Sequence, residues 1–146
     1  MYEIILVLHN TLRWLLLVSL AITLVKYLAG WMGNQPWKKI DNILGIIFTS
    51  LMDLQLIFGF TLYFFLSPYI KTAFSDFGAA MKNANLRFYA VEHLSLMLIA
   101  IVLVHVGRAK SKRAKTDRNK FKTAIIFFLI ALVIILAAIP WSRIQG

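Results

Sequence analysis

Four long apolar runs dominate the pattern of hydrophobic and polar positions along the chain. They extend approximately over residues 4–29, 44–66, 88–106 and 124–139. Each run approaches the roughly 20 residues that an α-helix needs to cross the hydrocarbon core of a bilayer. The short polar connections leave no room for a second domain. The pattern therefore predicts an all-α, integral membrane four-helix up-down bundle that forms one domain over residues 1–146.

Composition supports this interpretation. Hydrophobic residues make up 60% of the chain and charged residues 15%, well below the roughly 25% charged residues of a soluble domain. The first run is preceded by Glu3 instead of a basic segment and is interrupted by Arg13. A secretory signal peptide has the opposite features, so we expect the first run to be retained as a membrane span.

The basic residues predict the orientation. Eight of the 16 Lys and Arg residues lie between Arg108 and Lys122, in the connection between the third and fourth runs. By the positive-inside rule this connection faces the cytoplasm, which places both termini on the outer, periplasmic side of a bacterial cytoplasmic membrane. The expected partner of the basic connection is anionic membrane lipid. Nucleic acid is not an expected partner, because no folded binding module accompanies the charges.

Between the second and third runs, aromatic and turn residues predict an interfacial segment with a short surface helix over about residues 70–81. The chain contains no cysteine. Disulfides, thiolate ligands and dithiol chemistry are therefore excluded, and redox chemistry would require a bound cofactor.

Ionisable residues at membrane depth are costly and usually functional. Six residues are expected at membrane depth: His9, Arg13, Asp53, Glu92, His93 and His105. Asp53 and Gln55 point in nearly opposite directions on the second span, so only one can face the bundle centre. Asp53 is the expected proton or salt-bridge group, and His105 is expected to be interfacial, beside the basic connection.

Two of the histidines are expected at matching depth. His9 and His93 each lie five residues past the outer end of their run, about 7 to 8 Å below the outer hydrocarbon surface. The first and third spans of an up-down bundle occupy diagonal corners, so both side chains can converge on the central axis. We predict that His9 and His93 are axial iron ligands of one haem b. Gly59 would leave room for its edge, and Arg13 would reach a propionate or pair with a carboxylate, Asp53 or Glu92.

Other interpretations of these residues remain open. Polar groups in a membrane can serve only to bond one helix to another. A different metal, with Glu92 as an additional ligand, or a quinone would also use such residues.

Three stretches resemble a family: LHNTLRW at residues 8–14, MDLQLIFGFTLYFFLSP at 52–68 and NLRFYAVEHLSLMLIAIVLVHVGR at 85–108. They are similar to short bacterial four-span membrane proteins labelled cytochrome b or b561-like, and the resemblance covers nearly the whole chain. It implies a haem-binding helical bundle engaged in electron transfer, with His9 and His93 at the axial-ligand positions. Larger b-type cytochromes usually carry two haems, whereas this chain has three histidines and one matching pair.

The leading hypothesis is therefore a small b-type cytochrome that transfers electrons without converting a substrate. Its haem would lie near the outer face and exchange electrons with a quinol or a periplasmic carrier. The alternative is a non-catalytic accessory subunit that docks onto a larger respiratory or transport complex and needs no cofactor. A third hypothesis is a proton-coupled carrier or quinone-binding protein built on Asp53, Arg13 and His105, in which a homodimer would form the pathway.

Overall fold

The computed structural model describes residues 1–141, and its regular elements over these residues are all helical. Four long helical segments follow the four apolar runs. They are α1 (Tyr2–Met32), α2 (Lys39–Thr61) continued by the π-helical turn η1 (Leu62–Leu66), the π-helical turn η2 (Phe88–Glu92) continued by α6 (His93–Arg113), and α7 (Asp117–Ala138). All four are long and apolar enough to cross a membrane, which confirms the predicted spans and indicates a multi-pass membrane protein.

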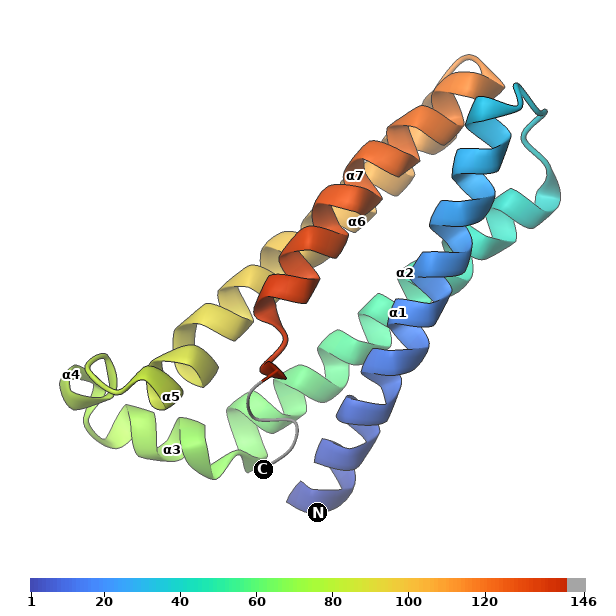
Figure 1. Cartoon of the computed structure of the whole chain (residues 1–146). Helices are drawn as coiled ribbons and strands as arrows, with labels where there is room; N and C mark the ends of the chain where they lie inside the picture. The colour runs from blue at the N-terminus through green and yellow to red at the C-terminus, as the bar shows by residue number, and fades with distance from the viewer. Residues whose placement is uncertain (142–146) are drawn as a thin grey trace.

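The long helices form an up-down bundle (Figure 1). Helix α1 packs against α2 and α7, and α6 packs against α7 and, less extensively, against α2. Helices α1 and α6 therefore occupy diagonal corners, as the up-down topology predicts. The start of α1 and the end of α7 lie at the same end of the bundle, the end that also carries α3, α4 and α5.

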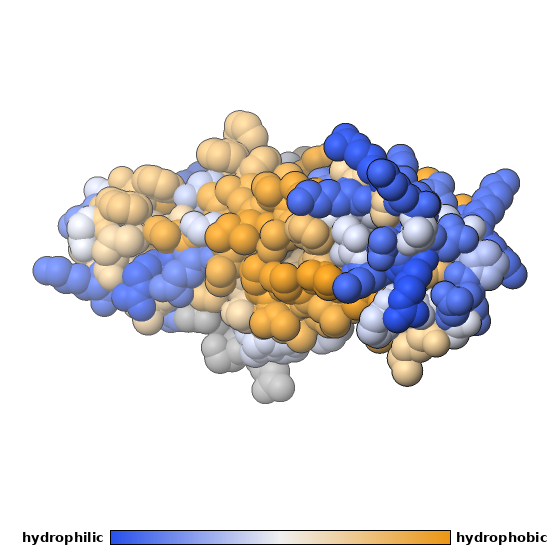
Figure 2. Space-filling view, turned by 90° about the horizontal axis from the view of Figure 1, so that it is seen from above, coloured by the Kyte–Doolittle hydropathy of each residue, from blue (hydrophilic) through white to orange (hydrophobic). Residues whose placement is uncertain are grey.

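The outside of the bundle carries many large apolar side chains. Leu20 and Phe128 are fully buried between the helices, whereas Val25, Ile57 and Val133 are each more than half exposed. Figure 2 shows, on the face in view, an apolar region across the middle of the molecule with hydrophilic residues toward both ends. Large exposed apolar surfaces are rare on soluble monomers, and an apolar region of this kind is what hydrocarbon requires.

Three short helices connect the second and third spans: α3 (Pro68–Ser75), α4 (Phe77–Ala80) and α5 (Ala84–Arg87). Each begins at a residue whose side-chain oxygen accepts a backbone N–H of the first turn, namely Ser67, Asp76 and Asn83. The predicted surface helix over residues 70–81 is thus present, but Asp76 divides it into two because it caps a second helix.

A buried polar cluster joins the helices at the end with the basic connections. The Asp41 carboxylate is fully buried, accepts a 2.7 Å ion-pair contact from Lys26 and caps α2 through the Lys38 N–H at 2.8 Å. Tyr27 donates to the Asp41 carbonyl at 2.7 Å, which ties α1 to the start of α2. This cluster was not predicted from the sequence, because Asp41 lies outside the apolar runs.

The first prediction concerns this cluster. Asp41→Ala should lower the free energy of unfolding by about 2 to 3 kcal/mol, since it leaves the partly exposed Lys26 ammonium and the α2 N-terminus without their acceptor. The thermal midpoint in detergent, followed by tryptophan fluorescence, measures this loss. Asp76→Ala removes only the exposed cap of a four-residue helix and should shift the midpoint much less. Equal shifts for the two variants would contradict the assigned role of Asp41.

The second prediction concerns orientation. Because the chain has no cysteine, Glu3→Cys and Lys115→Cys each introduce a single thiol, one at each end of the bundle. In intact bacterial cells, a membrane-impermeant maleimide should label the residue-3 variant and should label the residue-115 variant only after permeabilisation. The reverse pattern would place the termini in the cytoplasm.

Candidate functional site

His9 of α1 and His93 of α6 meet inside the bundle, near the end that carries α3–α5. Their ring centroids are 6.4 Å apart and the ring planes are inclined by 74°. Two imidazoles bound on opposite sides of one metal, each through a bond of about 2.0 Å, have centroids roughly 6 Å apart. The structure therefore brings together the two histidines that the sequence analysis paired, at a separation suited to a shared metal.

The two rings line a cavity of about 470 Å³, referred to below as the histidine cavity. This volume lies within the roughly 300–1,000 Å³ typical of cofactor and small-molecule sites. Residues from all four long helices line it, and most are apolar. Its polar and glycine positions are Tyr2, His9, Asn10, Arg13, Gln55, Gly59, Tyr63, Ser67, Tyr69, Tyr89 and His93.

A backbone carbonyl orients His93. Its Nδ1 lies 2.8 Å from the carbonyl oxygen of Ala138, in the last turn of α7. A carbonyl can only accept a hydrogen bond, so Nδ1 carries the proton and Nε2 keeps its lone pair. This tautomer, held by a hydrogen bond from the second ring nitrogen, is typical of histidines that bind metals.

His9 is less constrained. Gln55 donates to the His9 backbone carbonyl at 3.0 Å, while its contact with His9 Nε2 is long, at 3.5 Å. Among residues 1–141, His9 Nδ1 is buried without a hydrogen-bond partner. Neither ring nitrogen is thus strongly engaged by the described part of the chain.

Arg13 places a positive charge at the same cavity. Its side chain is only 9% exposed, and its one hydrogen bond within residues 1–141 is a 3.4 Å contact with the Asn10 side chain. Its Nε has no partner, and none of the ion pairs within residues 1–141 includes it. A buried cation is costly unless it is paired, so the site favours a ligand that carries an anionic group.

The expectation that Asp53 or Glu92 pairs with Arg13 was wrong. Asp53 contacts His105 at 2.6 Å, and Glu92 contacts Arg87 at 2.7 Å. Both carboxylates lie on other faces of their helices than the one that lines the cavity. His105 of α6 is thus a partner of Asp53, and it lies three residues before Arg108, the first residue of the basic connection.

Unpaired polar atoms are concentrated around the cavity. Four buried side-chain nitrogen or oxygen atoms within the described chain have no hydrogen-bond partner, and three of them belong to His9, Arg13 and Gln55. Buried polar atoms are nearly always satisfied in folded proteins. Their concentration around one cavity therefore indicates a site for a polar or metal-containing ligand, and argues against a purely structural role for these residues.

Gly59 lies directly against His9. A Cβ at position 59 would stand 3.4 Å from His9 Cε1 and 3.9 Å from His9 Nδ1. Any larger side chain would push the imidazole or fill the cavity beside it. On α7, by contrast, Ile135, Ile139 and Pro140 line the cavity, and the small residue Ala138 contributes its carbonyl.

Two π-helical turns border the site, and the sequence analysis predicted neither. In η1 the Ser67 N–H donates to the Leu62 carbonyl, and in η2 the His93 N–H donates to the Phe88 carbonyl. Such turns are rare and often occur at functional sites. The Tyr63 hydroxyl donates to the Ala90 carbonyl at 2.7 Å and so joins the two turns.

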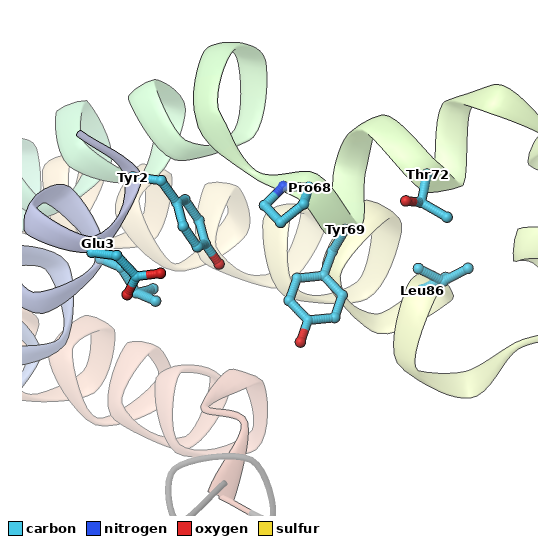
Figure 3. Close-up of a pocket in the computed structure, with 7 residues that line it drawn as sticks. Tyr2, Glu3, Pro68, Tyr69, Thr72 and Leu86 are labelled. Atoms are coloured by element: carbon cyan, nitrogen blue, oxygen red, sulfur yellow. The ribbon is translucent and has the colours of Figure 1, made fainter.

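A second hollow, of about 530 Å³, lies at the same end of the bundle between the start of α1 and the segment from α3 to α5. Figure 3 shows Tyr2 and Glu3 of α1 facing Pro68 and Tyr69. It shares Tyr2, Leu6 and Tyr69 with the histidine cavity. The hollow thus adjoins the cavity on the side away from the basic connections.

Within residues 1–141, no three His, Asp or Glu side chains approach closely enough to share a metal. Glu92 therefore does not join the two histidines as a third ligand, because Arg87 holds it elsewhere. Gln55 is the residue that the sequence analysis undervalued. Its position four residues before Gly59, on the same helical face, was the available signal.

No protein-family model, no curated protein and no solved structure matches this chain. The histidine cavity is consequently the feature that indicates a function. Its residues fit a haem in three respects. His9 and His93 are separated by a distance suited to one iron, and the buried, unpaired Arg13 could bind a propionate carboxylate. Gly59 leaves space beside the His9 imidazole.

The third prediction tests the link between the π-helical turns. Tyr63→Phe should lower the free energy of unfolding by about 1 kcal/mol, because it leaves the Ala90 carbonyl without its donor. Tyr69→Phe is the matched control, since the Tyr69 hydroxyl makes no hydrogen bond within residues 1–141. The thermal midpoints of the two variants in detergent measure the difference, and equal midpoints would refute the role of this hydrogen bond.

Proposed function

We propose that the chain is a small b-type cytochrome-like membrane protein that binds one haem b and transfers electrons. The observation that carries the proposal is the pairing of His9 and His93 at 6.4 Å, inside a cavity that also holds an unpaired arginine. A haem held by one histidine from each of two helices, with a cation at its propionates, would account for His9, His93 and Arg13.

In this proposal each side chain has a distinct task. His9 and His93 hold the iron, Arg13 neutralises a propionate, and Gly59 leaves room beside the His9 ring. The Ala138 carbonyl keeps the His93 proton on Nδ1. When bound, haem supplies an iron that changes its charge by one electron.

The proposed activity is electron transfer without substrate conversion. With His9 and His93 both holding a haem iron, the iron would have no free position for a substrate and would supply one-electron redox chemistry alone. The histidine cavity lies in the half of the bundle away from the basic connections, so one haem there would not bridge the bilayer. In the proposed orientation the cavity lies near the periplasmic side of the bacterial cytoplasmic membrane. A quinol from the membrane or a periplasmic carrier would exchange electrons with it.

The fourth prediction tests the cofactor and the ligand pair together. The protein purified in mild detergent should show the sharp reduced bands of a six-coordinate b haem, at about one haem per chain in a pyridine haemochrome assay. His9→Ala and His93→Ala should each lose these bands. Arg13→Leu should keep them but weaken haem affinity by about tenfold, because a charge-assisted hydrogen bond is lost.

His105→Ala is the matched control, since it removes the third histidine without touching the cavity. It should leave the reduced bands and the haem content unchanged. A protein that stays folded yet colourless after haem supplementation would refute the proposal, and would favour a cofactor-free docking subunit in its place.

A further inference from the structure

Gln55 of α2 is a polar side chain of the histidine cavity to which haem ligation and propionate binding assign no role. It lies four residues before Gly59, on the same face of α2, and both residues line the cavity. Both also lie against His9 of α1. Helix α2 thus meets His9 at two positions one turn apart, with an amide at one and a glycine at the other.

The backbone of α1 fixes the orientation of the Gln55 amide. Its Nε2 lies 3.0 Å from the His9 carbonyl oxygen. A carbonyl oxygen only accepts hydrogen bonds, so the nitrogen of the amide, and not its oxygen, must face α1. The same amide nitrogen lies 3.5 Å from His9 Nε2. The ring nitrogen Nε2 of His9 therefore faces a group that can only donate.

This contact favours one of the two neutral forms of the His9 ring. In a neutral imidazole one nitrogen carries the proton and the other a lone pair. A proton on Nε2 would face the hydrogens of the amide and be repelled, whereas a lone pair there is attracted to them. Nδ1 has no hydrogen-bond partner within residues 1–141 in either form, so the surroundings of Nε2 decide. The proton is thus expected on Nδ1.

The packing of the ring also favours Nε2 as the nitrogen that could bind a metal. His9 Nδ1 is buried, and a Cβ at position 59 would stand 3.9 Å from it and 3.4 Å from Cε1. The protein therefore encloses the Nδ1 side of the ring. At 3.5 Å the contact between the amide and Nε2 is a weak hydrogen bond, and it leaves the Nε2 lone pair available.

We propose that Gln55 is a positioning residue for His9: its amide keeps the ring proton on Nδ1 and leaves Nε2 unprotonated for the iron. The inference rests on the proposed function, because it assigns Gln55 a task in haem ligation. His93 has the same form for a different reason, since its Nδ1 donates to the Ala138 carbonyl. A donor near Nε2 prepares one ligand, and an acceptor at Nδ1 prepares the other.

NMR of the protein without haem tests this role directly. Nitrogen spectra of isotope-labelled histidines in detergent, at mildly alkaline pH where imidazoles are neutral, show which ring nitrogen carries the proton. In the wild type the His9 proton should reside mainly on Nδ1. Gln55→Met removes the amide and keeps an unbranched side chain. It should lower the ratio of Nδ1-protonated to Nε2-protonated His9 about fivefold, as expected for the loss of one weak hydrogen bond.

Two controls accompany this measurement. Gln35→Met makes the same substitution at an exposed position in the connection after α1, outside the cavity, and should leave His9 unchanged. His93 is the internal control, because the Ala138 carbonyl holds its proton and only a loss of fold would alter it. Gln55→Leu removes the same amide and serves if Gln55→Met does not fold. An unchanged His9 ratio in the folded variant would overturn the proposal, as would a wild-type His9 protonated mainly on Nε2.

Haem titration of the same variants separates this inference from the proposed function. Gln55→Met should weaken haem binding about tenfold, as is typical when a group that orients a metal ligand is lost. Gln35→Met should bind haem as the wild type does. Equal haem affinity with and without the Gln55 amide would overturn the positioning role and leave the proposed function standing. A wild type that binds no haem would refute the proposed function, and with it the part of this inference that concerns iron.

Discussion

Hydrocarbon offers no hydrogen-bond partner, so every polar group of these helices that lies at membrane depth must be satisfied by the protein or by a bound molecule. The arrangement of the bundle follows from that constraint at three levels. Near the basic connections the polar cluster around Asp41 is closed by Lys26, Tyr27 and the backbone. Around the histidine cavity the polar atoms converge without completing their bonds. On the outside of the bundle, Asp53 and His105 contact each other at 2.6 Å and are half-exposed.

The extent to which the polar groups are hydrogen-bonded within the protein separates the structural residues from the candidate functional ones. Closed clusters stabilise the bundle and specify how α1 meets α2. The incomplete ones are costly to the isolated chain and are explained only by something that binds to them. The cavity is enclosed and combines two imidazoles with a cation, which suits a cofactor. The Asp53–His105 pair, by contrast, is half-exposed on the outer surface of α2 and α6.

Much of the fold could be predicted from the sequence. The length of a membrane span is set by the thickness of the bilayer, and the basic connections predict its orientation. The pairing of His9 with His93 was also accessible, since it depends only on depth and on the diagonal placement of α1 and α6. The choice of partner for Arg13 was not accessible. Whether Asp53 faces Arg13 or His105 depends on how far each helix is rotated about its own axis. The π-helical turns at 62–66 and 88–92 change this rotation, and no sequence pattern predicts them.

The hydrogen bond from His93 to the Ala138 carbonyl has a further consequence. Ala138 ends α7, and carbonyls in a last helical turn have no donor within their own helix. His93 therefore acts as a side-chain cap for α7 as well as a candidate ligand. By thermodynamic linkage, a molecule that fixes His93 also strengthens the end of α7, and fraying of that end loosens the binding site. Occupancy of the cavity is thus coupled to the folding of the last turn of the chain's final span.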